Sequence, residues 1–269
     1  MQVAVVQLNT QEDVVHALSV VRHRVAEAAA AGAKLVCLPE NFAFMGEEAK
    51  KRELAERLDG AFPGPILSAL AECATRHGVW VLGGGMPEKS DDISRPYNTS
   101  VLVDPQGGVA ATYRKVHLFD VSLPDGTSYR ESAATSPGAE PVTTEVLGAR
   151  VGLTICYDVR FPELYRHLAD QGARIVMVPA AFTLTTGKDH WQVLLRARAI
   201  ENQVYVLAPA QHGKHARGRL TYGKSMIIDP WGEVIAQCSE GEGFAVAKLD
   251  FDYQDRVRSS LPSLLHRKW

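Results

Sequence analysis

The 269-residue sequence predicts an α/β fold with four layers, an αββα sandwich built from two similar halves. The first reason is an internal repeat. The second is an alternation of short Val, Ile and Leu runs with helical stretches, which is typical of strands buried on both faces. Two sheets that each carry helices on one face bury their bare faces by packing together around a pseudo-two-fold axis. We expect one domain over residues 1–269.

The repeat pairs four segments of each half in the same order. "AKLVCLPENFAF" (33–44) aligns with "ARIVMVPAAFTL" (173–184), and three more pairs are "QVAVVQL" (2–8) with "RVGLTIC" (150–156), "VWVLGGG" (79–85) with "VYVLAPA" (204–210), and "TSVLVDPQGGVAATY" (99–113) with "KSMIIDPWGEVIAQC" (224–238). Each apolar run predicts a strand. The D-P-x-G turns at 104–107 and 229–232 each predict a hairpin.

Three helices are predicted over 12–32, 63–78 and 162–172. The first has acidic residues at its start, apolar residues at three-and-four spacing and Gly32 at its end. The other two have a proline near the first turn and a glycine past the last one. Between them lie the predicted strands.

Composition excludes several classes of function. The net charge is −2, from 29 basic and 31 acidic residues, so the chain lacks the basic surface of a protein that binds nucleic acid or anionic membranes. The N-terminal segment has no signal-peptide pattern, and no apolar run is long enough to span a bilayer. We expect a cytoplasmic protein that acts on a small molecule.

Motifs for metals and cofactors are also absent from the sequence. The four cysteines are scattered without a C-x-x-C pair, which argues against a zinc ribbon and a disulfide framework. "LGGG" (82–85) lacks the G-K-[ST] of a phosphate loop, and His212 and His215 have no third ligand nearby. There is no G-x-S-x-G elbow of a serine hydrolase. We therefore expect no metal and no cofactor.

Three positions differ between the aligned halves where a ligand would bind. Glu40 aligns with Ala180, Cys156 with Leu8 and Lys115 with Glu240. Ligands of α/β sheets collect beyond the carboxyl ends of strands, where Glu40 and Cys156 are predicted to lie. Singly, the cysteine could be a buried apolar residue, the glutamate a helix cap and the lysine a solvated charge.

Together, a thiol, a carboxylate and an ammonium are the parts of an acyl-transfer site. Cysteine attacks as a thiolate, so we expect a base, a cation or the helix start after Pro162 to lower the pKa of Cys156. The oxyanion formed in the attack needs donors, for which Lys115 and the backbone N–H of Tyr157 are candidates.

The motifs "LPENF", "YRKVHLFD" and "ICYDVRFPEL" resemble those of the nitrilase, or carbon-nitrogen hydrolase, superfamily over essentially the whole chain. The resemblance implies a Glu-Lys-Cys triad on an αββα sandwich. By it, Glu40 is the general base, Lys115 stabilises the tetrahedral intermediate and Cys156 is the nucleophile that carries a thioester. Glu131, in "YRESAATSPG", matches a second glutamate that positions the lysine.

Within the superfamily, four stretches are similar to the branch that acts on deaminated glutathione: "YDVRFPEL", "HWQVLLRARAIENQVYVLAPAQHGKH", "YGKSMIIDPWGEVIAQCSEGEG" and "LPSLLHRKW". This resemblance implies an amidase that releases 2-oxoglutarate and cysteinylglycine. One alternative is the ω-amidase branch, which cleaves 2-oxoglutaramate. Others are a binding or scaffold protein with the same fold and a dinucleotide-binding protein, although the glycine fingerprint of the latter is missing.

A substrate with several carboxylates needs fixed cations. Candidate substrate contacts are Arg160, Phe182, His190 and Arg198, and further cations nearby are Lys188, Arg196, Lys214, His215, Arg217 and Arg219. Arg196 and Arg198 could instead pair with Glu201 and brace a helix. The family resemblance implies a homodimer or higher homo-oligomer, with residues 160–169 as the candidate interface.

Overall fold

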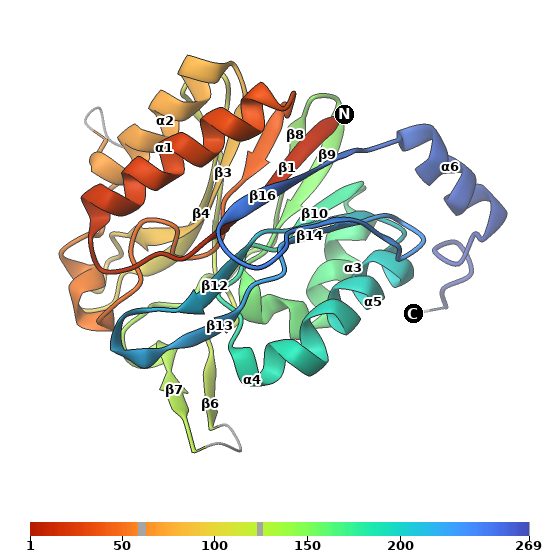
Figure 1. Cartoon of the computed structure of the whole chain (residues 1–269). Helices are drawn as coiled ribbons and strands as arrows, with labels where there is room; N and C mark the ends of the chain where they lie inside the picture. The colour runs from red at the N-terminus through yellow and green to blue at the C-terminus, as the bar shows by residue number, and fades with distance from the viewer. Residues whose placement is uncertain (59–62, 123–125, 269) are drawn as a thin grey trace.

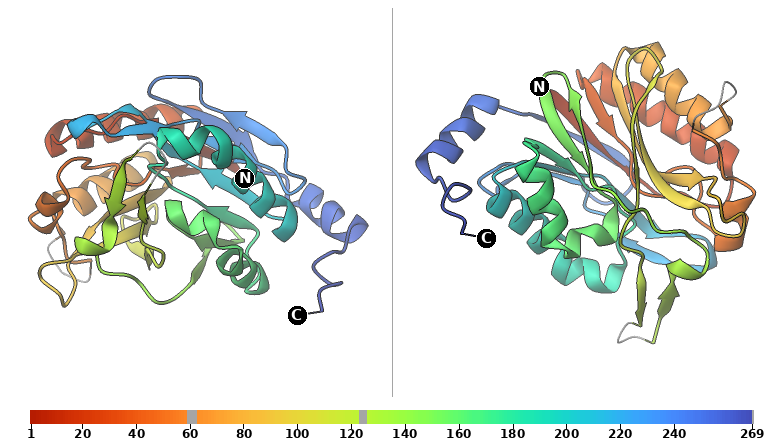
Figure 2. Two further views of the ribbon diagram at one scale, coloured as in Figure 1. Left: turned by 90° about the horizontal axis from the view of Figure 1, so that it is seen from below. Right: turned by 180° about the vertical axis from the view of Figure 1, so that it is seen from behind.

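Two β-sheets lie face to face between two layers of helices in the computed structural model, which describes residues 1–58, 63–122 and 126–268 (Figure 1). Helices α1 (Val14–Ala30) and α2 (Pro65–His77) cover the outside of one sheet. Helices α3 (Pro162–Asp170) and α5 (Gln192–Asn202) cover the outside of the other, as the view from behind also shows (Figure 2). The predicted αββα sandwich is confirmed.

The first sheet has the order β13-β12-β1-β2-β3-β4-β5, and β16 also pairs with β1. Its strands are β1 Gln2–Leu8, β2 Leu35–Cys37, β3 Trp80–Glu88, β4 Tyr97–Val103, β5 Val109–Arg114, β12 Ala210–Lys214, β13 Leu220–Tyr222 and β16 Gly243–Lys248. The strands β1, β2 and β3 are parallel, whereas β3, β4 and β5 are antiparallel.

The second sheet has the order β15-β14-β11-β10-β9-β8. Its strands are β8 Val142–Val146, β9 Ala149–Leu153, β10 Ile175–Met177, β11 Tyr205–Ala208, β14 Met226–Ile228 and β15 Val234–Gln237. The strands β9, β10 and β11 are parallel, and β14 and β15 form an antiparallel hairpin, as the repeat predicts.

Strand β1 shows how the layers pack. Val3 and Val5 belong to the apolar core between the sheets, whereas Ala4 and Val6 pack into a second core under α1 and α2. All four side chains are fully buried. Because alternate side chains of a strand point to opposite faces, a continuous apolar run is required wherever both faces are covered.

The helix ends follow the predicted signals. The side chain of Asp13 accepts a hydrogen bond from the backbone N–H of His16 at 3.0 Å and so caps α1. Gly78 follows α2 in the left-handed region, at φ 62°, a conformation that costs glycine little. Shorter helical segments are Glu48–Arg52, Glu131–Ala133, Cys156–Arg160, Leu184–Thr186, Gly187–Trp191 and Ala216–Gly218, and α6 spans Phe251–Ser260 near the C-terminus.

Part of the second half joins the first sheet, which the repeat does not predict. The repeat predicts one strand over 204–210, whereas the structure divides it at Pro209 into the end of β11 and the start of β12. Proline has no N–H to donate, so a strand can change sheets there. Ala210 of β12 then lies opposite Gln7 of β1, and this crossing ties the sheets together.

The glycine-rich segment "LGGG" is part of a strand. Its residues Gly83, Gly84 and Gly85 lie inside β3 and form no phosphate loop. Across the described ranges, no helix combines the length and apolar character needed to cross a bilayer, and no group of three or more His, Cys, Asp or Glu side chains could hold a metal. All four cysteines are buried and unpaired with one another. Trp269, the last residue of the tail motif, lies outside the described residues.

Candidate active site

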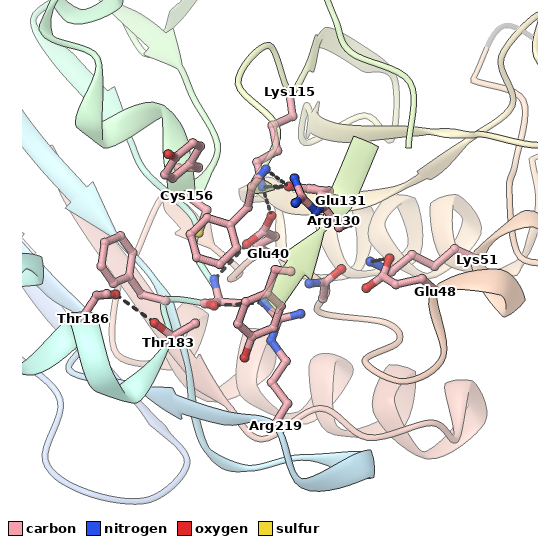
Figure 3. A pocket seen from close by; sticks show the side chains of 16 residues that line it. Glu40, Glu48, Lys51, Lys115, Arg130, Glu131, Cys156, Thr183, Thr186 and Arg219 are labelled. Atoms are coloured by element: carbon pink, nitrogen blue, oxygen red, sulfur yellow. Dashed lines mark hydrogen bonds and ion pairs between the residues drawn. The ribbon is translucent and has the colours of Figure 1, made fainter. Parts of the chain in front are cut away.

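The three residues that distinguish the two halves line one cavity (Figure 3). Glu40 follows β2, Lys115 follows β5, and Cys156 begins the short helix after β9. The first two come from one sheet and the third from the other. The cavity has a volume of about 80 Å³. The cavity therefore lies where the strand ends of both sheets meet. The three side chains around it are those that the comparison of the two halves singled out.

Three donors hold the carboxylate of Glu40, which is 3% exposed. Its Oε1 accepts hydrogen bonds from Nζ of Lys115 and Nδ2 of Asn98, both at 2.9 Å. Its Oε2 accepts one from the backbone N–H of Ala181 at 2.9 Å. Burial raises the pKa of Glu40, but the charge and hydrogen bond of Lys115, together with the charge of Arg219, lower this pKa from 4.5 to about 2. Glu40 is thus ionised at neutral pH.

Lys115 is 2% exposed and lies between two carboxylates. Besides Glu40, its Nζ donates to Oε2 of Glu131 at 2.9 Å and to Oε1 at 3.1 Å. Oε2 of Glu131 also accepts the backbone N–H of Phe119 at 2.7 Å, which orients it. Burial favours the neutral amine, but Glu131 and Glu40 raise the pKa of Lys115 well above 10.5. The ammonium is therefore permanently charged.

Cys156 sits at a sharp turn between β9 and the short helix. Its φ of 47° is in the left-handed region, which costs a residue with a side chain roughly 1–3 kcal/mol and persists only where the surroundings enforce it. The enforcing contact is the hydrogen bond from its backbone N–H to the carbonyl of Pro179 at 2.8 Å. The turn presents the thiol to the cavity, where it is 8% exposed.

The expectation of a lowered thiol pKa at Cys156 is wrong. Burial and the negative charge of Glu40 raise the pKa of Cys156 well above 9.0, and the opposing effects of Lys115 and of the backbone N–H of Ala181 are smaller. The thiol and the carboxylate of Glu40 line the same cavity and influence each other's protonation. The resting pair is thus a protonated thiol beside an ionised carboxylate, and attack by sulfur requires that carboxylate to take the proton.

Aromatic rings form the apolar wall of the cavity. Phe119, Tyr129, Tyr157 and Phe182 line it. The ring centroid of Phe119 lies 5.0 Å from that of Tyr157, in an edge-on arrangement, and 5.2 Å from that of Tyr129. Such a wall excludes water and strengthens the electrostatic interactions inside. Tyr157, whose backbone N–H is the predicted oxyanion donor, follows Cys156 in the chain and lines the same cavity.

Of the four predicted substrate contacts, Phe182 lines the cavity, and Arg160, His190 and Arg198 are not among the described residues that do. The guanidinium of Arg160 lies 5.3 Å from the ring centroid of Phe182, and its Nη2 lies 3.3 Å from Nδ1 of His190. These two residues back the aromatic wall. Arg198 pairs with Glu201 at 2.9 Å and donates to a backbone carbonyl, so it braces α5.

One of the further cations suggested by the sequence, Arg219, does reach the cavity. His215 does not bind a ligand there, because Thr10 and Thr221 contact its two ring nitrogens at 2.8 and 2.6 Å. The sequence reasoning missed further lining residues: Asn41, Glu48, Lys51, Phe119, Tyr129, Arg130, Thr183 and Thr186. Four of these lie within the motifs quoted above and could have been found there: Asn41 in "LPENF", Phe119 in "YRKVHLFD", and Tyr129 and Arg130 in "YRESAATSPG".

Comparisons with known proteins agree with this site. The family model "Carbon-nitrogen hydrolase" matches residues 2–259. A deaminated glutathione amidase of Synechocystis sp. is 51% identical over 239 residues, which are 88% of this chain and 86% of that protein. The C. elegans NitFhit structure has a TM-score of 0.91 and 38% identity, covering 99% of this chain and 65% of its own.

In a third similar protein, the active-site cysteine has reacted with a small molecule. The amidase from Nesterenkonia sp. AN1 has a TM-score of 0.79 and 28% identity, covering 97% of this chain and 98% of its own. That structure is a variant captured after Michael addition of acrylamide at the active-site cysteine.

Proposed function

This chain belongs to the carbon-nitrogen hydrolase family, and we propose that it hydrolyses the amide of deaminated glutathione through a thioester on Cys156. It is an amidase. One observation carries the proposal: a thiol, an ionised carboxylate and a charged ammonium converge in a buried cavity of a chain 51% identical to a deaminated glutathione amidase. The products are 2-oxoglutarate and cysteinylglycine.

In the first step, Glu40 takes the proton of the Cys156 thiol while sulfur bonds to the amide carbon. Glu40 suits this role because it is ionised and lines the same cavity as that thiol. The raised pKa of Cys156 makes the thiolate strongly nucleophilic once the proton has moved. The carbonyl π-electrons move to oxygen, which becomes the oxyanion of a tetrahedral intermediate.

Lys115 and the backbone N–H of Tyr157 stabilise this oxyanion. An ammonium has three N–H donors, and Glu40 and Glu131 accept from those of Lys115 in the resting site. The third donor makes the longer contact, 3.1 Å to Oε1 of Glu131, and it is the one that becomes available to the oxyanion. A fixed cation in an apolar cavity favours the new negative charge without reorganisation, which is the main source of rate in such sites.

The intermediate collapses when the C–N bond breaks and Glu40 returns its proton to the departing amine. The acyl group stays on sulfur as a thioester. Water then attacks the thioester carbon as Glu40 takes one of its protons. The C–S bond breaks, the carboxylic acid leaves, and the thiolate recovers the proton from Glu40. Every proton is thus passed through a single carboxylate.

The test is release of 2-oxoglutarate from deaminated glutathione and from 2-oxoglutaramate, measured in parallel for the unaltered protein, Cys156→Ala and Glu40→Gln. We expect preference for deaminated glutathione and loss of turnover in both variants. Cys238→Ala is the matched control, because Cys238 is also buried but lies outside the cavity lining.

Three results separate the alternatives. Turnover of 2-oxoglutaramate alone makes the protein an ω-amidase with the same triad. Full activity of Cys156→Ala overturns the mechanism. No turnover of either substrate by the unaltered protein leaves an amidase with a different substrate, and reaction of Cys156 with iodoacetamide would then show whether its thiol is still activated.

We also propose a cytoplasmic location and a homodimeric assembly. Four unpaired cysteines are typical of a reducing compartment. The candidate interface, 160–169, includes most of α3, which packs beside α5. Two large apolar side chains of α5 are exposed, Val193 at 65% and Ile200 at 47%. Sedimentation velocity should show a dimer that Val193→Asp dissociates.

A further inference from the structure

The active-site cavity is too small for the substrate proposed above. Its volume is about 80 Å³, whereas pockets that hold ligands of tripeptide size measure roughly 300–1,000 Å³. A second cavity of about 510 Å³ adjoins it and shares Glu48, Tyr129, Thr183 and Arg219 with it. A long substrate must therefore extend from the inner cavity, at Cys156, into the outer one.

The chemistry decides which part of the substrate occupies which cavity. After the C–N bond breaks, the acyl group remains on Cys156 in the inner cavity, while the amine must depart before water can attack. The amine also receives its proton from Glu40. The outer cavity, which joins the inner one at the four shared residues, provides the space for this departing amine.

The peptide group of Ala181 connects Glu40 with Arg219, and so places Arg219 near the amine portion of the substrate. Its N–H donates to Oε2 of Glu40 at 2.9 Å, and its carbonyl accepts from Nη2 of Arg219 at 3.4 Å. In Figure 3, Arg219 lies on the side of Glu40 away from Lys115. A charged group of the departing amine would thus meet Arg219 just beyond the reacting bond.

Arg219 makes no ion pair with a described carboxylate, although its charge helps to lower the pKa values of Glu40 and Glu48. Its buried Nε also has no hydrogen-bond partner within the described residues. Its guanidinium lies 5.3 Å from the ring centroid of Tyr129, which fixes the plane of the group without neutralising it. Two other cations of the cavity linings are paired, Arg217 with Glu47 at 2.8 Å and Lys51 with Glu48 at 2.8 Å. Arg130 lines the inner cavity but is not among the described residues that line the outer one.

We infer that the outer cavity is a binding site for the leaving dipeptide, and that Arg219 binds its terminal carboxylate. This inference rests on the proposed function and names what distinguishes deaminated glutathione from a simple amide. The acyl portion is common to both substrates. Only the longer one has an amine portion with a carboxylate that can reach Arg219.

The experiment compares three substrates: deaminated glutathione, the same molecule with its glycine carboxylate converted to a carboxamide, and 2-oxoglutaramate. Each is assayed with the unaltered protein, Arg219→Gln, Arg219→Lys and the control Lys214→Gln. Lys214 is exposed on the neighbouring strand β12 and is not among the residues that line either cavity.

We expect Arg219→Gln to lower kcat/KM for deaminated glutathione by about 10- to 100-fold, mainly through KM, because a charged hydrogen bond is lost. The carboxamide should lower kcat/KM of the unaltered protein by a similar factor and cause little further loss in Arg219→Gln. Arg219→Lys should recover part of the loss, and Lys214→Gln should resemble the unaltered protein.

Equal losses of Arg219→Gln on all three substrates would overturn the inference, as would full activity of the unaltered protein on the carboxamide. Either result leaves the proposed function intact. If the unaltered protein releases no 2-oxoglutarate from deaminated glutathione, the proposed function fails first and the dipeptide site with it.

Discussion

The carboxylate of Asp158 accepts a hydrogen bond from the hydroxyl of Tyr113 at 2.8 Å. Asp158 is fully buried, two residues after Cys156, and Tyr113 is two residues before Lys115. Oδ1 of the same carboxylate also contacts Nδ1 of His117 at 2.7 Å, two residues after Lys115. One buried carboxylate therefore joins the segments that carry the ammonium and the thiol, and sets their separation.

Asp158→Asn should lower kcat by about 10- to 100-fold with little change in KM, because a small misplacement of reacting groups is costly. We also expect the free energy of unfolding to fall by about 1–3 kcal/mol. Steady-state kinetics and urea denaturation measure the two effects. Tyr113→Phe removes only one of the contacts and should have a smaller effect on both. An Asp158→Asn variant with unchanged kcat would contradict this positioning role.

Lys115→Met should destabilise the protein as well as inactivate it. The variant leaves Glu40 and Glu131 buried without their cation, and breaking a buried ion pair costs about 3–5 kcal/mol. Adding Glu131→Gln to Lys115→Met should restore part of that stability but no activity. Urea denaturation of the single and double variants at neutral pH tests this. Equal stability of the two would show that Glu131 becomes protonated or hydrated instead.

Stability should fall as the pH is lowered through the titration range of His215. Burial lowers the pKa of His215 from 6.5 to about 4, so between these values the unfolded chain binds a proton that the folded one does not. The stabilising contribution is complete above about pH 6.5 and is lost progressively towards pH 4, by roughly 2–3 kcal/mol.

His215→Gln should flatten this part of the stability profile, measured by urea denaturation at several pH values. Glu40 does not titrate in the same window, because its pKa is lowered to about 2. A variant with the same acid slope as the unaltered protein would assign the loss to other groups.

Gly84→Ala should disturb both stability and catalysis. A Cβ at Gly84 would collide with the carbonyl oxygen of Leu38 and the side chain of Pro179, which precede the segments at Glu40 and Ala181. Since Leu38 contributes backbone, the collision is relieved only by moving the site, at a cost of about 1–3 kcal/mol. The control is Gly243→Ala in β16, where a Cβ meets no atom within 4 Å. Thermal unfolding that is equal for the two variants would refute this expectation.

Local patterns predicted most of the fold because they report burial directly. The apolar runs at 3–6 and 35–38 are continuous because both faces of those strands are covered. The differences between the aligned halves likewise pointed to Glu40 and Cys156. They could not identify Asn98, Asp158 or Arg130, because these residues acquire their neighbours only when distant segments meet.

The sequence by itself thus determined the two repeated halves, the sandwich and the three chemical groups, since periodicity and residue type are properties of short segments. The tertiary structure decided the protonation states and the choice between cations. The thiol pKa of Cys156 is raised, and Arg219 rather than Arg198 faces the cavity. The physical reason is that desolvation and Coulomb interactions act through space, as between Glu40 and Lys115, which are 75 residues apart in the chain but 2.9 Å apart in the fold.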